Sequence, residues 1–493
     1  MAAVVASVPL VYLAIRGLEI DRGDVLATLT RTQTTALMVR SLLLTAAVCA
    51  TCFAIGTATA WILTRVRLPG GRLWMVAAAL PLAAPSYVAA TGWLATVPGW
   101  NGFVPSWLVL SAVSVPYVTL PVLASLRSAD TAPAEVARSL GRSPAAAWLT
   151  TTLPQVAPAA AAGSLLVGLY VLSDYGAVSI FRFEVFTFAI SRQYNSFIGR
   201  DSAVVLAIVL VAIALAVVAA ERFARGRGQR WRTGSGVRRS PDRRGAGRWT
   251  LPAAAFLLLP AVVALGIPVA ALVQRLIADT SGSLDRTELL TATANTAVVA
   301  AVAAVAALLL ALPIGVLAAR HRGAAVALLE TGGYTGHALP GIVVALSLVY
   351  LSLRVVPDLY QSLTILVFAY VVLFLPQAIA AVRGSVGLVP PTLPQVARSL
   401  GRGPVAASAS TTWRLSSPGL AAATLLVTLT VMKELPATQL LRPTGFDTLA
   451  TEIWSRTTAA AYGDAAPYAL ALVVVAVLPA FWLSRPSAWE RTR

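Results

Sequence analysis

Lysine is almost missing from this chain. Of 493 residues only Lys433 is a lysine, so nearly all of the 38 basic residues are arginine. A nucleotide-binding P-loop needs a Gly-Lys pair, because its lysine reaches the phosphates. Lys433 follows Met432 and precedes Glu434, which does not fit that pattern. The chain therefore carries no nucleotide site of this type and cannot hydrolyse ATP in that way by itself.

Cysteine and histidine are scarce as well, with two of each. Cys49 and Cys52 form a C-x-x-C inside an apolar run without a His or further Cys nearby, so core packing is the favoured interpretation. His321 stands between two arginines, and His337 alone in an apolar segment is better interpreted as a packing residue than as a ligand. With no Ser/His/Asp set and no metal-spaced carboxylates, we expect no catalytic residue, no metal site and no cofactor.

Charged residues make up only 12% of the chain, well below the share of about a quarter in soluble domains, whereas hydrophobic residues make up 58%. This composition is typical of a protein embedded in a bilayer. The net charge of +18 could suggest a nucleic-acid partner. However, most arginines stand at the ends of apolar runs, where they set membrane orientation. We therefore expect a multi-pass membrane protein that contacts lipid and binds no nucleic acid.

Apolar stretches long enough to cross a bilayer recur along both halves of the chain. Counting a shorter stretch at Ala2–Ile15, they predict an all-α membrane protein with about 12 transmembrane helices, six in each half. Ala2–Ile15 has no basic residue before it and does not resemble a signal peptide, so either it is a tilted or thin first helix or the true start lies upstream. The other predicted spans lie near residues 41–63, 73–96, 104–126, 159–180, 203–220, 251–273, 295–319, 335–353, 362–382, 418–441 and 466–484, with kinks expected at Pro81, Pro85, Pro340 and Pro376.

A segment rich in arginine separates the two halves. Ten arginines lie between Arg222 and Arg248, with Gly and Ser among them, which is typical of a flexible charged linker. The sequence thus predicts a first transmembrane half at residues 1–220, a basic cytoplasmic linker at 221–250 and a second half at 251–493.

One polar segment occurs twice. Glu135–Arg142 returns almost unchanged as Gln395–Arg402, 260 residues later, and each copy has the pattern of a short amphipathic helix between apolar runs. The same offset pairs Asp174 with Glu434. Such a parallel duplication predicts two halves related by an axis along the membrane normal. Under the arginine bias, both polar segments face the cytoplasm.

These two segments resemble the EAA motif of permeases of ATP-binding-cassette (ABC) importers. The resemblance implies the type I ABC importer permease fold and two cytoplasmic coupling helices on which separate ATPase subunits dock. In the second copy Gln395 replaces the acidic residue, and Trp413-Arg414 stands where the first has Leu153-Pro154, so the docking contacts are expected to be asymmetric or weaker there. The implied coupling residues are Glu135, Ala137, Arg138, Leu140 and Gly141 in the first copy and Gln395, Ala397, Arg398, Leu400 and Gly401 in the second.

Further segments narrow the resemblance to fused ferric-iron importer permeases, over nearly the whole chain from Thr34 to Phe481. These segments are Leu80–Val88, Leu172–Phe181, His337–Leu346, Met432–Pro443 and Gly445–Thr451. The resemblance implies a multi-pass protein of the bacterial inner (plasma) membrane that imports ferric iron. It also implies an extracytoplasmic binding protein that delivers the iron and two copies of one ATP-binding subunit. Importers of thiamine, phosphonate or another small solute share the two-half plan and remain an alternative.

Two adjacent pairs of polar residues inside predicted spans carry an ionisable acid: Asp174 and Tyr175 in one half, Lys433 and Glu434 in the other. Such residues usually face a protein interior or a watery cavity, so we place them along a translocation pathway. Two carboxylates would suit a hard cation. The favoured alternative is that they pair with arginines or with Lys433 and hold an outer gate together, the candidate arginines being Arg182 and Arg442. A secondary transporter driven by an ion gradient is a rival hypothesis, but it leaves the duplicated polar segments unexplained.

Overall fold

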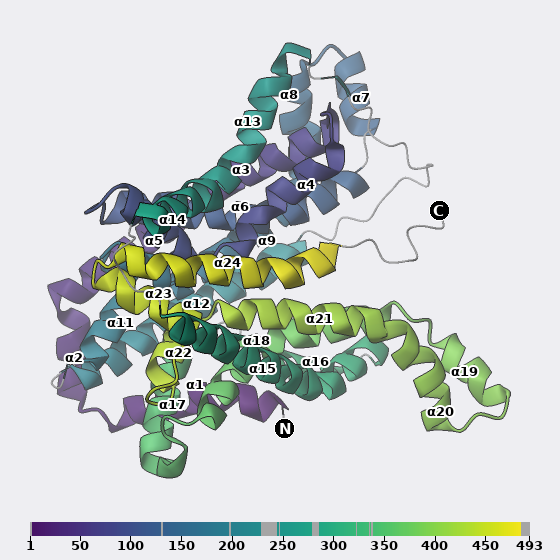
Figure 1. Ribbon diagram of the computed structural model, residues 1–493. Coiled ribbons are helices and arrows are strands. Elements are labelled where there is room, and N and C mark those ends of the chain that lie inside the picture. Colours follow the sequence, from purple (N-terminus) through teal and green to yellow (C-terminus); the bar gives the residue numbers. More distant parts are fainter. Residues whose placement is uncertain are drawn as a thin grey trace. The chain divides into compact units, whose positions relative to one another are not determined.

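The computed structural model describes most of the chain as helix (Figure 1). The described residues are 2–129, 132–196, 199–227, 244–245, 247–278, 285–321, 323–334, 336 and 339–484. His337 and most of the predicted linker lie outside them. In the described residues the strand structure is one parallel pair, β1 (Val66–Arg67) with β2 (Arg244–Gly245).

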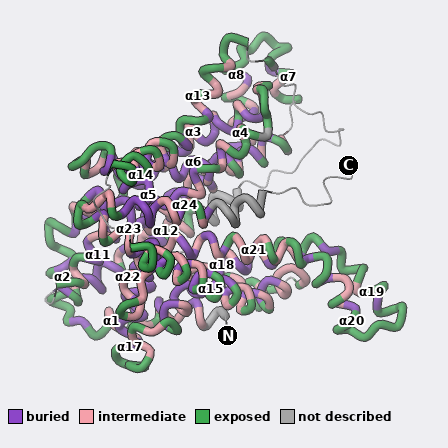
Figure 2. The backbone as a smooth tube through the Cα atoms, viewed as in Figure 1, coloured by how far each residue is buried: buried purple, intermediate pink, exposed green. Residues whose placement is uncertain are grey.

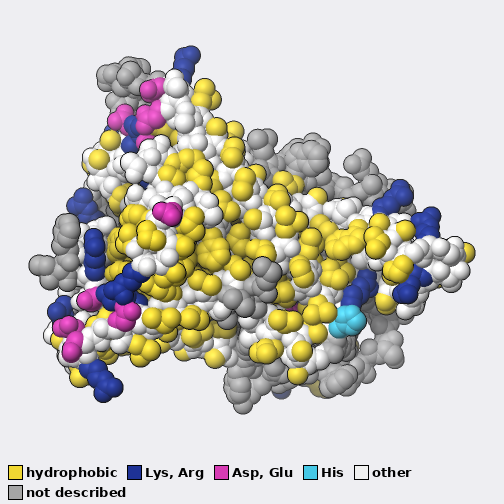
Figure 3. Space-filling view, turned by 90° about the horizontal axis from the view of Figure 1, so that it is seen from below, with side chains coloured by type: hydrophobic (Ala, Val, Ile, Leu, Met, Phe, Trp, Pro, Cys, Tyr) yellow, Lys and Arg dark blue, Asp and Glu magenta, His cyan; other side chains and the backbone are white. Residues whose placement is uncertain are grey.

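Eight described helical segments are long and apolar enough to cross a membrane, or nine if one sharply bent pair counts as a span. The protein is therefore an all-α, multi-pass membrane protein. Twelve spans were predicted, and several of them are shorter or interrupted in the structure. Hydrophobic side chains make up much of the surface shown in Figure 3, as contact with lipid requires. The eight segments are Thr32–Arg65, Phe103–Arg127, Pro144–Ser173, Arg200–Ala220, Gly247–Ala278, Arg286–Arg320, Leu363–Gly387 and Pro404–Met432.

The chain divides into two compact units, each built from separate stretches of sequence. Unit 1 comprises Met1–Leu26, Tyr194–Val211 and Asp279–Arg493, and unit 2 comprises Ala27–Gln193 and Ala212–Ala278. The helix α12 (Arg200–Arg227) thus contributes to both units. The short helix α2 (Arg22–Thr30) also runs from one unit into the other.

Three long helices form the core of unit 2. The helices α3 (Thr32–Arg65), α6 (Phe103–Ser128) and α9 (Leu153–Ser173) each pack against the other two. Glycines permit this close packing: a Cβ atom at Gly163 of α9 would lie only 2.7 Å from the carbonyl oxygen of Tyr117 in α6. Apolar side chains between the three helices are removed from water and lipid alike, and dispersion contacts hold them together.

Unit 1 repeats this arrangement with α15 (Arg286–Arg320), α18 (Leu363–Gly387) and α21 (Arg414–Met432), which also pack pairwise. Glycine again sets the spacing, because a Cβ atom at Gly315 would lie 2.7 Å from the Cβ of Val382. A buried hydrogen bond is repeated as well. The Phe186 amide donates to Ser41 Oγ over 3.1 Å in unit 2, and the Leu449 amide donates to Thr296 Oγ1 over 2.9 Å in unit 1.

A sharp bend precedes the most buried short helix of unit 2. The segment formed by α4 (Gly71–Ala79) and η1 (Leu80–Ala83) meets α5 (Ser86–Thr96) at 89°. Pro85 stands at the bend in extended conformation, which confirms the kink predicted there. Figure 2 shows α5 as largely buried. The predicted span at 73–96 is therefore a broken one rather than a straight helix.

The same plan appears in unit 1, where α16 (Ala324–Gly333) is followed by α17 (Gly341–Val355) directly after Pro340. Pro376 differs, because α18 runs through it without a break. Further helical elements are α10 (Gly176–Ile180), α11 (Phe186–Tyr194), η3 (Gly247–Trp249), η6 (Pro357–Leu359), α22 (Pro436–Leu441), α23 (Leu449–Thr458) and α24 (Tyr462–Ser484).

The helices that open the two sequence halves are exchanged between the units. In unit 1, α1 (Ala2–Glu19) packs on α16 and α17, and the Tyr12 hydroxyl donates to the Tyr350 carbonyl over 3.0 Å. Arg16 adds an ion pair of 2.8 Å to Asp201. In unit 2, α13 (Thr250–Ala261), η4 (Val262–Gly266) and α14 (Ile267–Ala278) pack on α4, α5 and α6. Each unit is therefore completed by a segment from the other half of the sequence.

We expect Gly92→Ala to destabilise unit 2. Gly92 lies in α5, where an added Cβ atom would meet the backbone of Pro268 in α14, 2.7 Å from its carbonyl oxygen. Backbone atoms cannot move aside cheaply, so we expect a loss of about 1–3 kcal/mol in the free energy of unfolding. The midpoint of thermal unfolding in detergent measures this. Gly71→Ala is the matched control, because nothing lies within 4 Å of its Cβ position; an equal midpoint for both variants would contradict the prediction.

Candidate functional site

The first polar segment forms a helical hairpin at one end of unit 2. It consists of α7 (Ala132–Ser139), a turn and α8 (Pro144–Ala147). Gly141 makes the turn with φ of +86°, a conformation that costs other residues about 1–2 kcal/mol. Two backbone bonds close it: the Arg142 amide donates to the Ala137 carbonyl, and the Gly141 amide donates to the Arg138 carbonyl, each over 3.0 Å. This geometry is typical of a helix C-cap with glycine in the left-handed conformation.

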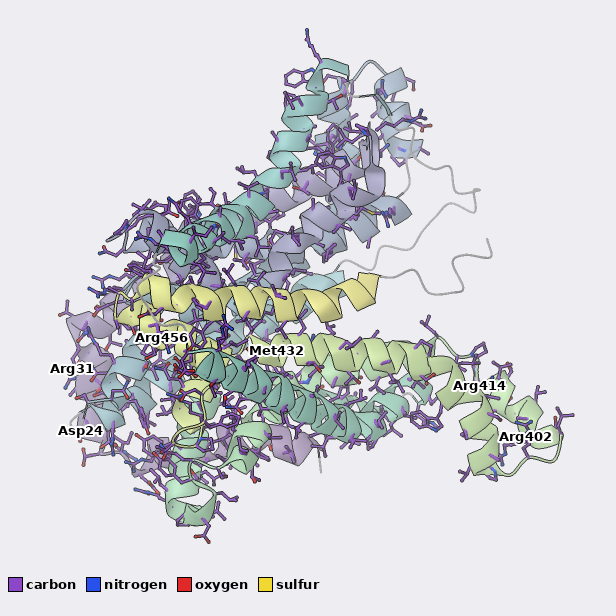
Figure 4. All side chains as sticks on the ribbon, in the orientation of Figure 1. Asp24, Arg31, Arg402, Arg414, Met432 and Arg456 are labelled. Carbon is purple, nitrogen blue, oxygen red and sulfur yellow. The ribbon has the colours of Figure 1, made fainter. Side chains whose placement is uncertain are left out.

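The second polar segment has the same structure at one end of unit 1. It consists of α19 (Thr392–Ser399), a turn and α20 (Pro404–Ser408). Gly401 also has φ of +86°, and the Arg402 amide donates to the Ala397 carbonyl over 3.1 Å. Figure 4 shows Arg402 beyond the end of α21 that Arg414 marks. We refer to residues 132–147 and 392–407 as the first and second hairpins.

Both hairpins expose apolar side chains. Leu140 and Leu400 are 79% and 78% exposed, and Val136 and Val396 are 56% and 54% exposed. Ala137 and Ala397 are buried instead and hold each hairpin together. Figure 2 shows α7, α8, α19 and α20 as largely exposed. Apolar side chains that face solvent between arginines suit a surface that docks on another protein.

A π turn follows each hairpin. It spans Trp148–Thr152 before α9 and Ala409–Trp413 before α21. Threonine hydroxyls bond back to the preceding turn in both, Thr151 to the Ala147 carbonyl over 2.5 Å and Thr411 to the Ala407 carbonyl over 2.6 Å. π turns inside helices often mark functional positions. Each hairpin is thus joined through a π turn to a long helix of its unit.

The long helix of unit 2 ends at Asp174. With 21 residues α9 is about 32 Å long. Asp174 leaves the helix in extended conformation, and its Oδ1 accepts hydrogen bonds from the amides of Ala177 and Val178, over 3.0 and 3.4 Å. Its Oδ2 accepts a short hydrogen bond from the hydroxyl of Ser86, the first residue of α5. Asp174 therefore caps α10 and ties it to α5.

Glu434 has the matching role in unit 1. It stands two residues after Met432, the last residue of α21, which Figure 4 labels. Its carboxylate accepts from the amides of Ala437 and Thr438, over 3.1 and 3.2 Å, and so caps α22. Gly341 stands first in α17, where Ser86 stands in α5, and a Cβ atom there would lie 2.5 Å from Glu434 Oε1. A longer carboxylate thus occupies the space that glycine leaves open.

These contacts correct two sequence interpretations. The predicted spans at 159–180 and 418–441 are interrupted at Asp174 and at Lys433–Glu434, so the carboxylates lie at helix ends rather than inside continuous helices. Arg442, a candidate partner of the carboxylates, pairs with Asp447 instead. Tyr175 accepts a hydrogen bond of 3.2 Å from Ser191. The structure brings each carboxylate to the start of a buried helix, but a place along a translocation pathway stays a prediction.

Sequence reasoning missed Ser86 and Gly341. The available signal was their position directly after Pro85 and Pro340, where a helix begins. Cys49 and Cys52 are both free thiols that donate to helix carbonyls, those of Ser164 and Ser111, as packing residues do. Within the described residues there is no group of three or more His, Cys, Asp or Glu that could hold a metal ion.

Comparison with known proteins finds a match over nearly the whole chain. A Fe(3+)-transport system permease protein of Haemophilus influenzae, FbpB 2, is 33% identical over 481 residues, which cover 97% of this chain and 95% of that protein. Sulfate transport system permease proteins CysT match a shorter stretch. Those of Escherichia coli and Salmonella typhimurium are 32% and 31% identical over 139 residues, a quarter of this chain and half of each relative. No protein-family model matches the chain.

Proposed function

We propose a transport function on one premise: this chain belongs to the Fe(3+)-transport permease family of the ABC importers. In the proposal, it is the membrane subunit that moves ferric iron into the cytoplasm of a bacterial cell. The chain lies in the inner membrane, and a binding protein on the outer side delivers the iron. Two copies of an ATP-binding subunit supply the energy, one at each hairpin.

The observation that carries the proposal is the pair of matching hairpins. Their backbones share the same glycine turn, and both expose Leu and Val at equivalent positions. A lone exposed leucine is ordinary on a protein surface. Two equivalent sites on one chain suit a partner that is present in two copies, which is how a homodimeric ATPase would meet them.

Ferric iron is the proposed substrate because the relative that covers nearly the whole chain is a Fe(3+)-transport permease. Sulfate, thiamine and phosphonate are the alternatives within the same importer class. The described residues hold no cluster of three metal-ligating side chains, and both buried carboxylates accept hydrogen bonds from amides. Asp174, Tyr175, Lys433 and Glu434 remain our proposed residues along the route.

Uptake measurements test the substrate. A strain that lacks the gene is complemented with the wild-type chain and supplied with radiolabelled ferric iron, radiolabelled sulfate or radiolabelled thiamine in separate assays. We expect complementation to restore iron uptake and to leave the other two at background. Restored sulfate or thiamine uptake without iron uptake would assign the permease to that solute.

The source of energy is tested in the same strain. We expect iron uptake to stop when ATP is depleted, even while the proton gradient persists. The pair Gly141→Asp and Gly401→Asp, which strains both turns and adds charge to both hairpins, is expected to reduce uptake to background. Uptake that continues without ATP would favour the ion-gradient transporter, in which Asp174 and Glu434 carry the ions.

A further inference from the structure

The two hairpins share one backbone but present different side chains. Residues 392–400 have the same sequence of buried and exposed positions as residues 132–140, and both turns have the same φ. Any difference in how the hairpins bind a partner must therefore come from their side chains. Because an ATPase homodimer presents two identical docking surfaces, such differences translate directly into unequal affinity.

One exposed position carries a larger apolar side chain in the second hairpin. Val405 is 83% exposed and stands where the first hairpin has Ala145. At another position that differs in apolar side chain, Leu393 of the second hairpin and Pro133 of the first are both exposed. Val405 lies on the same hairpin as Val396 and Leu400 and extends its exposed apolar set.

The charges of the two hairpins differ as well. The first carries Glu135, Arg138 and Arg142, a net charge of +1. The second carries Arg398 and Arg402 without an acidic residue, a net charge of +2, because Gln395 replaces the glutamate. Both hairpins present two arginines at matched positions to the partner surface. On the second hairpin that surface meets no acidic side chain, whereas on the first it also meets Glu135.

We propose that the second hairpin binds its ATP-binding subunit more tightly than the first, chiefly through Val405. This inference rests on the proposed function. It is opposite in direction to the weaker docking of the second hairpin that the Gln395 substitution suggested from the sequence. Burying the two additional methyl groups of valine at position 405 accounts for about a tenfold difference in affinity. The first subunit to bind therefore occupies the second hairpin.

The test is a titration of the full-length permease in lipid nanodiscs with the ATP-binding subunit that co-purifies with it. We expect two binding steps of unequal affinity for the wild type. Val405→Ala should weaken the tighter step about tenfold, and Ala145→Val should strengthen the weaker step until the two steps merge. Val355→Ala is the matched control, because Val355 is an exposed valine at the end of α17 in the same unit and should leave both steps unchanged.

The outcomes separate this inference from the function on which it rests. If the wild-type chain binds no ATP-binding subunit at all, the proposed function fails. If the wild type binds but Val405→Ala leaves both steps within twofold of it, only the inequality of the hairpins is refuted. A larger loss from Leu140→Asp than from Leu400→Asp would also overturn it. Thermal unfolding of each variant shows whether the fold is intact, as the exposure of these residues leads us to expect.

Discussion

Replacing Leu140 and Leu400 together with Asp is expected to abolish both ATPase association and iron uptake. The two leucines are among the most exposed apolar side chains of the chain, so their replacement leaves the folded permease intact. Burial of a leucine at an interface contributes about 1.5–3 kcal/mol, and a carboxylate in its place adds a cost of desolvation. Loss of the leucine contact at both hairpins should weaken association of the permease with the ATP-binding subunit at least about a hundredfold. Co-purification with the ATP-binding subunit and uptake of radiolabelled iron measure the two effects.

Leu18→Asp is the matched control for this pair. Leu18 is 87% exposed at the end of α1, in the same unit as Leu400. The second hairpin follows the C-terminal end of α18, a helix of 25 residues and about 38 Å in length. Leu18 belongs to a different helix and is not part of either hairpin. We expect Leu18→Asp to retain ATPase association. Undiminished association in the double variant, or equal loss in the control, would mean that the hairpins are not the docking surface.

Asp174→Ala and Asp174→Asn are expected to have opposite outcomes. Alanine removes the acceptor for the Ala177 amide and for the Ser86 hydroxyl, both buried, which should cost about 1–3 kcal/mol of stability and most of the uptake. Asparagine keeps an oxygen for the amide, and its NH2 group can donate to Ser86, whose hydroxyl also accepts. We therefore expect Asp174→Asn to retain most of the thermal stability and most of the uptake.

The pair of variants separates a capping carboxylate from an ion carrier. A group that carries protons or metal ions must ionise, so Asn would disable it as fully as Ala. Glu434→Gln is the parallel test in unit 1, because Gln keeps an oxygen for the amides of Ala437 and Thr438. If both amide variants lose uptake while keeping wild-type stability, the capping interpretation is wrong and the carboxylates take part in transport directly.

The duplicated segments were predictable because their signal is local. Glycine at positions 141 and 401 and the spacing of Ala, Arg and Leu before it are enough to specify a helix and its C-cap. The structure confirms a short helix in each duplicated segment, and it shows a second short helix after each glycine turn that the sequence analysis did not predict. The long spans were predictable for a similar reason, since hydropathy alone decides which segments prefer lipid.

The interruptions of the spans were not predictable in the same way. Most residues on either side of Asp174 and Glu434 are apolar, and the helices stop because each carboxylate binds amides of the next turn and lies against a neighbouring helix start. That contact joins residues 88 positions apart in the case of Ser86 and Asp174. A hydropathy profile averages over such single residues, so it extends both spans past the point at which the helix ends.

The exchange of opening helices has a consequence for any attempt to divide the chain. A cut in the segment between α12 and α13 would leave α1 on one fragment while its packing partners α16 and α17 remain on the other, and α14 would likewise be parted from α5. Neither fragment could assemble its own compact body alone. Each unit needs segments from both halves of the sequence. Two fragments that result from such a cut would therefore have to be produced together in order to fold.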